Sequence, residues 1–157
     1  NSRAIGKIKD LENFKEYQNA FVGIGNNKLR DELIDLLERL GYQVPVLIHP
    51  TAYISRSALI EAGTVVEPKA IVNANTKIKK GSIVSVGAIV DHDVTLGKCV
   101  HVNAGAIVEA GGKVKDFEKL EAGSVRRGFK QVLVAANSND EFVREEKEKT
   151  GMDISFF

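Results

Sequence analysis

This sequence contains little cysteine, few aromatic residues and no excess of charge of either sign. The single cysteine, Cys99, excludes an intrachain disulfide, so we expect a reducing, cytoplasmic setting. No stretch approaches the roughly 18 consecutive apolar residues of a membrane-spanning helix, so no membrane partner is expected. With 22 basic against 21 acidic side chains and no long basic run, the 157-residue chain lacks the footprint of a nucleic-acid binder. Tryptophan is absent and aromatic residues make up 6%, so aliphatic side chains must build the core.

Aliphatic residues occupy every sixth position through the middle of the chain. All thirteen positions of this series are Ile, Val or Leu: Ile48, Ile54, Ile60, Val66, Val72, Ile78, Val84, Val90, Leu96, Val102, Val108, Val114 and Leu120. Three residues after the aliphatic one, six hexads carry glycine and a seventh carries Asn75, residue types that tolerate positive φ. Each hexad therefore predicts a short strand followed by a corner.

Three such hexads make one triangular turn of a parallel β-helix. A β-sandwich is the natural rival, but it requires alternation, and the positions two after the aliphatic residue include Pro50, Pro68 and Asp116. Period six holds where period two fails. We therefore predict a mainly β fold in which the aliphatic residues stack inside a three-sided prism.

The residue just before each interior aliphatic should point outward, and many of these residues are apolar. They are Leu59, Val65, Ile71, Ile83, Ile89 and Ile107. β-Branched residues favour strands wherever they lie, but an apolar stripe that spans several turns also predicts burial against another subunit.

A small α/β unit is predicted ahead of the repeat. Residues 20–24 are predicted to form a strand and Gly25-Asn26-Asn27 a turn. Residues 28–40 are predicted to form a helix that stops at Gly41, and residues 44–48 lead into the first turn of the prism. A strand, helix and strand in this order make a βαβ unit. The turn before its helix either exposes backbone N–H groups that suit an anion or is a plain cap of the helix.

These patterns divide the chain into three parts. We expect an N-terminal α/β subdomain over 1–47, the β-helix over 48–125, and a C-terminal strand and helix over 126–157. Within the last part, residues 131–135 are predicted as a strand and residues 141–149 as a charged helix.

Four short motifs make the chain similar to a known family. GIGNN at 23–27, LIHP at 47–50, VDHD at 90–93 and VHVNAGA at 100–106 occur in one order. In this respect the chain resembles the hexapeptide-repeat acyltransferases, and more narrowly the sugar O- and N-acetyltransferases of sialic-acid and bacillosamine pathways. That resemblance implies a left-handed β-helix, a homotrimer, and transfer of acetyl from acetyl-CoA to an amino or hydroxyl group of a nucleotide-linked or sialic-acid-type sugar.

The resemblance also implies roles for individual residues. His92 is expected to be the general base, Asp93 to orient it, and His101 to contact the acetyl group of the coenzyme. Gly25, Asn26 and Asn27 are expected to bind the sugar substrate. Ala110 and Gly111 are expected to contact coenzyme A. The family's first strand and its glycine-rich turn have no counterpart in this sequence, so we expect a truncated sugar-binding subdomain.

His92 and His101 are nine residues apart, which is half a turn of the prism. Within one chain the two histidines should therefore lie on different sides. We expect the active site to form between neighbouring chains.

Two other functions are compatible with the sequence. Three histidines, His49, His92 and His101, would suit a zinc hydratase, although His49 lies some two turns from His92. No metal is expected for this reason. A non-catalytic, trimeric β-helical scaffold is the other alternative, because the apolar stripe alone would drive assembly.

Overall fold

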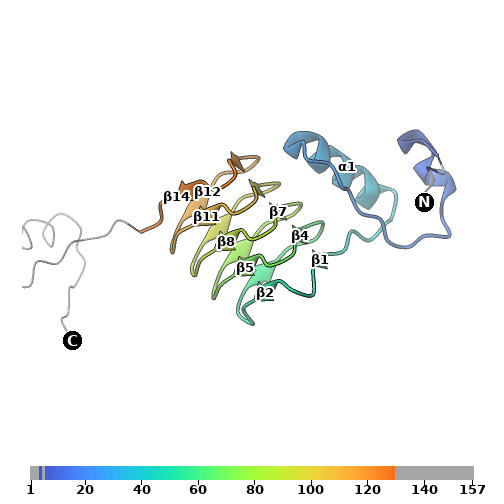
Figure 1. Cartoon of the computed structure of the whole chain (residues 1–157). Coiled ribbons are helices and arrows are strands. Elements are labelled where there is room, and N and C mark those ends of the chain that lie inside the picture. Colours follow the sequence, from blue (N-terminus) through green and yellow to red (C-terminus); the bar gives the residue numbers. More distant parts are fainter. Residues whose placement is uncertain (1–3, 5, 130–157) are drawn as a thin grey trace, which may run out of the picture.

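The computed structural model describes residue 4 and residues 6–129 of the chain (Figure 1). A 3-10 helix, η1 (Ile8–Asn13), is followed by one α-helix, α1 (Asn27–Arg39), and then by strands of two residues each. The strands are β1 (Leu47–Ile48), β2 (Tyr53–Ile54), β3 (Leu59–Ile60), β4 (Val65–Val66), β5 (Ile71–Val72), β6 (Lys77–Ile78), β7 (Ile83–Val84), β8 (Ile89–Val90), β9 (Thr95–Leu96), β10 (His101–Val102), β11 (Ile107–Val108), β12 (Lys113–Val114), β13 (Lys119–Leu120) and β14 (Val125–Arg126).

Each strand pairs in parallel with the strand that lies three further along the chain. Leu47 is opposite Val65, and that 18-residue step repeats at every pairing. The pairings build three sheets: the β1 sheet (β1, β4, β7, β10, β13), the β2 sheet (β2, β5, β8, β11, β14) and the β3 sheet (β3, β6, β9, β12). Figure 1 shows the turns stacked one upon another along the prism. This is the architecture of the predicted left-handed parallel β-helix.

The predicted aliphatic series forms the interior of the prism. Its thirteen members are the second residues of β1 to β13. From Val66 to Leu120 all of them are buried, in one continuous core. Ile48 is 46% exposed, because the first turn has no earlier turn to cover it. The interior was therefore predicted correctly, with its first turn forming an open end.

Every corner from Gly63 onwards has a residue with positive φ. Glycine occupies six of these eleven corners and Asn75 a seventh, as predicted. Lys69, Asp93, Cys99 and Phe117 occupy the others, with φ between 50° and 62°. The fold imposes this conformation because the corner N–H donates to the corner one turn earlier, as Asp93 N does to the Ala74 carbonyl at 2.9 Å. Sequence alone did not reveal the four corners that lack glycine or asparagine.

Helix α1 begins and ends within one residue of its predicted bounds. The Asn26 side chain caps it by accepting a hydrogen bond from Leu29 N at 3.0 Å. Gly41, with φ of 87°, follows its last turn.

The strand predicted at residues 20–24 was wrong. The structure has only an isolated parallel bridge there, between Asn19 and Gln43, and residues 44–46 are not strand either. In the described part of the chain, neither Asn19 nor Gln43 belongs to any of the sheets. A single bridge with no further strand beside it does not extend into a strand. The βαβ unit is thus reduced to a bridge and a helix.

Helix α1 packs against the corner where the β3 sheet meets the β1 sheet. Ile34 is fully buried there, and a Cβ on Gly63 or Gly81 would lie within 2.9 Å of its Cδ1. The Arg30 guanidinium, also fully buried, donates to the carbonyls of Gly81 at 2.6 Å and Cys99 at 3.0 Å. The predicted strand and helix over residues 131–149 lie outside the described residues.

Candidate functional site

His92 lies at the corner that follows β8, between the β2 sheet and the β3 sheet. Its Nδ1 is 2.7 Å from Asp93 Oδ2, and the two side chains are 52% and 45% exposed. Because a carboxylate can only accept, the proton of a neutral His92 sits on Nδ1. Nε2 is then the unprotonated nitrogen, as a general base requires.

The carboxylates around His92 favour its protonated form. The hydrogen bond that His92 donates to Asp93 raises the pKa of His92, and the charges of Asp91 and Asp93 add to the effect. The pKa of Asp93 is lowered by its hydrogen bonds with His92 and with Asn75. Hydrogen bonds from Asn73 and from the His92 backbone lower the pKa of Asp91. His92 is therefore a base flanked by two ionised carboxylates.

His101 is the first residue of β10, in the β1 sheet. Its Nε2 is 3.0 Å from Ser85 Oγ. Burial lowers the pKa of His101, and the positive charges of Lys119 and Arg30 lower it further. Its Nδ1 is buried and has no hydrogen-bond partner among the described residues. His101 is therefore a neutral imidazole with one nitrogen left to donate or accept.

One copy of the chain does not bring the two histidines together. His92 follows a strand of the β2 sheet, whereas His101 belongs to the β1 sheet. This agrees with the separation expected from their nine-residue spacing.

The predicted sugar-binding turn lies at the N-terminus of α1. Gly25 and Asn26 are exposed, and the Asn26 carboxamide oxygen is engaged in the helix cap. Asn27 Nδ2 donates to the Phe117 carbonyl at 2.9 Å, and Asn27 Oδ1 accepts from Arg30 at 2.8 Å. Asn27 therefore joins the helix to the β-helix, a structural contact that the motif did not reveal.

Ala110 and Gly111 lie one turn beyond His92 on the same corner. Gly111 N donates to the His92 carbonyl at 3.0 Å, which continues the corner ladder. The Phe129 ring covers Gly111 so closely that a Cβ there would clash with it, and Phe129 N donates to the Ala110 carbonyl at 2.9 Å. Phe129 lies beyond the repeat, and no pattern in the sequence predicts this contact.

The outward-facing residues form three different columns. The column on the β2 sheet is apolar throughout: Tyr53, Ile71, Ile89, Ile107 and Val125. The column on the β1 sheet begins apolar and ends polar: Leu47, Val65, Ile83, His101 and Lys119. The column on the β3 sheet is mostly polar: Leu59, Lys77, Thr95 and Lys113. The single stripe predicted from the sequence is thus two neighbouring faces, with Leu59 apart from both.

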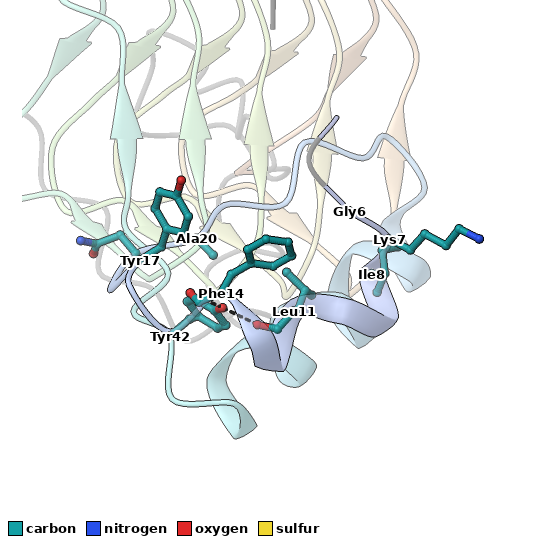
Figure 2. A pocket seen from close by; sticks show the side chains of 9 residues that line it. Gly6, Lys7, Ile8, Leu11, Phe14, Tyr17, Ala20 and Tyr42 are labelled. Carbon is teal, nitrogen blue, oxygen red and sulfur yellow. Dashed lines mark hydrogen bonds between the residues drawn. The ribbon is translucent and has the colours of Figure 1, made fainter. Parts of the chain in front are cut away.

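An apolar cavity lies away from these residues, between η1 and the segment that leads to α1 (Figure 2). Its volume is about 290 Å³, and Leu11, Phe14 and Tyr42 are among its lining residues. The Tyr42 hydroxyl lies 2.6 Å from the Leu11 carbonyl oxygen and 3.0 Å from that of Phe14. None of the predicted site residues lines this cavity, so it is not the candidate centre.

Metal ligands do not gather in the described part of the chain. Residues 4 and 6–129 contain no group of three or more His, Cys, Asp or Glu side chains placed to hold a metal ion. His49 instead pairs with Thr51 across 2.9 Å. Among the same residues no helix is long and apolar enough to cross a membrane.

Comparison with solved structures gives neighbours with the same β-helix. The acetyltransferase domain of PglB from Neisseria gonorrhoeae FA1090, in complex with acetyl coenzyme A, is 37% identical with a TM-score of 0.69; the match covers 70% of this chain and 54% of that one. The same domain in a second structure gives 37% identity and a TM-score of 0.76, with coverage of 79% and 62%. This chain therefore spans 54% to 62% of the PglB domain's length.

A third neighbour is PerB from Caulobacter crescentus, in complex with CoA and GDP-perosamine. It is 27% identical with a TM-score of 0.68, and the match covers 76% of this chain and 68% of that one. Neither protein-family models nor curated protein sequences match the chain.

Proposed function

We propose that this chain transfers acetyl from acetyl-CoA to an amino or hydroxyl group of a nucleotide-linked or sialic-acid-type sugar. Its structural neighbours confirm the predicted resemblance to the hexapeptide-repeat sugar acetyltransferases. The observation that carries the proposal is the His92–Asp93 pair, at 2.7 Å, on a fold whose neighbours bind acetyl-CoA or CoA. The GDP-perosamine bound to PerB supports a nucleotide sugar as the acceptor.

His92 would act as the general base. Its Nε2 carries no proton while Asp93 holds Nδ1, so it can take the proton of an acceptor amine or hydroxyl. A positioned general base contributes typically ~10²–10⁴-fold to the rate. The half-exposed imidazole leaves room for a sugar to approach.

Acetyl-CoA would supply the acetyl group as a thioester. His101 suits a contact with the acetyl carbonyl, because burial lowers its pKa and keeps the ring neutral. Ala110 and Gly111 would flank the coenzyme, since they follow His92 on the same corner. Gly25, Asn26 and Asn27 would bind the sugar; of these, Gly25 and Asn26 are exposed, whereas Asn27 is held by the β-helix.

The assembly that fits this site is a homotrimer. The β2 sheet presents an apolar column whose ends, Tyr53 and Val125, are 58% and 48% exposed. The β1 sheet adjoins it and carries His101 where its apolar column ends. Packing the β2 sheet of one copy against the β1 sheet of the next would bring His101 towards the neighbour's site. A reducing, cytoplasmic setting is still what the single cysteine favours.

The test replaces His92 by alanine and measures CoA release from acetyl-CoA with UDP-, GDP- and CMP-linked amino sugars as acceptors. We expect turnover to fall at least ~100-fold, because the base is lost. His49→Ala is the matched control, since His49 is an exposed corner histidine whose only side-chain partner in the described part is Thr51.

Equal turnover in the two variants would refute His92 as the base. Absence of turnover in the unmodified protein with every acceptor, while it still forms trimers, would instead favour the non-catalytic scaffold.

A further inference from the structure

The turn of the prism that precedes His92 carries a second layer of polar side chains. Asn73 and Asn75 lie 18 residues before Asp91 and Asp93, on the same corner. Asn73 Nδ2 donates to Asp91 Oδ1 at 2.9 Å, and Asn75 Nδ2 donates to Asp93 Oδ1 at 3.2 Å. Both carboxylates beside His92 are thus held from the turn below.

The two oxygens of Asp93 have different partners. Oδ2 faces His92 Nδ1 at 2.7 Å, and Oδ1 accepts from Asn75. A carboxylate with one attachment can rotate about its Cβ–Cγ bond, whereas two attachments on opposite oxygens fix its plane. The side chains of Asp93 and His92 are 45% and 52% exposed, so packing against neighbouring side chains of the chain does little to fix the plane of the Asp93 carboxylate.

Asn75 is itself held in place by the corner ladder. Its φ is 58°, and its N–H donates to Ser57 Oγ, one turn earlier, at 3.0 Å. Asparagine is among the few residue types other than glycine that tolerate this conformation, and it also carries an amide that reaches the next turn. Ser57, Asn75, Asp93 and His92 therefore form one chain of hydrogen bonds that ends at the proposed base.

We infer that Asn75 is a positioning residue, which fixes the plane of Asp93 so that Asp93 holds His92 in the Nδ1-protonated form. This inference rests on the proposed function for its catalytic consequence. Its structural part, the state of the His92 ring, can be measured without any substrate. Asp91, Asp93 and Glu109 are the acidic groups on this corner, and Glu109 is paired with Arg127.

The test replaces Asn75 by glycine, which keeps the positive φ and removes only the amide. Lys69→Gly is the matched control. Lys69 has the same φ of 58°, and its N–H donates to Thr51 Oγ1 at 3.1 Å, but it lies on a different corner and has no side-chain contact with His92 or Asp93.

The first measurement is histidine NMR, with the three histidines assigned through single His→Gln variants. In Asn75→Gly we expect a lower pKa of His92 and a larger share of the Nε2-protonated tautomer, with His49 unchanged; in Lys69→Gly we expect neither change. The second is steady-state kinetics, in which Asn75→Gly should lower kcat roughly tenfold, a fraction of a general base's contribution, with the KM for acetyl-CoA unchanged.

A His92 ring that titrates alike in the two variants would overturn the inference. So would an altered ring with an unchanged kcat, because Asn75 would then position nothing that matters for transfer. If the unmodified protein transfers no acetyl group, the proposed function fails, while the NMR comparison still decides whether Asn75 fixes the His92–Asp93 pair.

Discussion

Replacing Arg30 by methionine should weaken the packing of α1 against the β-helix. The buried guanidinium donates to the carbonyls of Gly81 at 2.6 Å, Cys99 at 3.0 Å and Ile24 at 2.8 Å. Burial lowers the pKa of Arg30, which means that burying the charge is itself unfavourable. Methionine keeps an apolar stem of similar length and removes every one of these donors.

The size of the effect follows from the acceptors that remain. Two buried carbonyls, of Gly81 and Cys99, would lose their guanidinium donor, at about 1–3 kcal/mol each. Relief from burying the charge offsets part of this, so we expect a net loss of about 2–4 kcal/mol in the free energy of unfolding. Because each turn of a solenoid contacts mainly its neighbours, the loss should fall on α1 rather than on the prism.

Urea unfolding followed by circular dichroism gives the free energy, and hydrogen exchange of the α1 amides locates the change. Arg39→Met is the control, since Arg39 is an exposed residue at the end of the same helix and should cost less than ~1 kcal/mol. The reasoning is refuted if the two variants are equally stable, or if strand amides lose protection while those of α1 keep it.

Three further outcomes are expected. Gly81→Ala should lower the free energy of unfolding by about 2–4 kcal/mol, because φ at this position is 70° and the new Cβ would lie 2.6 Å from Cys99 Sγ. Gly87→Ala, at φ of 64° with no atom within 4 Å of the new Cβ, should lower it by only about 1–2 kcal/mol; thermal or urea unfolding measures both. Because the pKa of His92 is raised and the proposed base must be neutral, kcat/KM should fall as pH drops through a value above about 6.5. Asp93→Asn should move this acidic limb of the pH–rate profile to lower pH. An acidic limb that does not move would contradict the pairing of His92 with Asp93. If the proposed trimer forms, Ile89→Asp on the β2 sheet should dissociate it in sedimentation, whereas Thr95→Asp on the β3 sheet should not.

The period of six was sufficient to predict the prism. It predicted the interior residue of β1 to β13 because a strand of two residues followed by a corner can bury only one large side chain per hexad. The strand predicted at residues 20–24 failed for the opposite reason. Its apolar residues have the right composition, but a strand needs a paired neighbour, and one sequence does not say whether that neighbour exists.

The candidate site was only partly visible in the sequence. The motif around His92 pointed to a base and an acidic partner, and His92 Nδ1 does lie 2.7 Å from Asp93 Oδ2. Asn73 and Asn75, which donate to these carboxylates, lie 18 residues earlier, and the sequence motif does not identify them as partners. Their role becomes apparent only when the turns are stacked. Likewise, the Phe117 and Glu118 carbonyls to which Asn27 donates lie 90 and 91 residues away along the chain.

By itself the sequence determined which side chain of each hexad points inward and where α1 starts and stops. Those features depend on residues within a few positions of one another, through the six-residue repeat and helix capping. The tertiary structure alone decided which outward residues share a face, which corners meet α1, and which amides hold Asp91 and Asp93. Those contacts join turns 18 or more residues apart, so they exist only once the chain has wound upon itself.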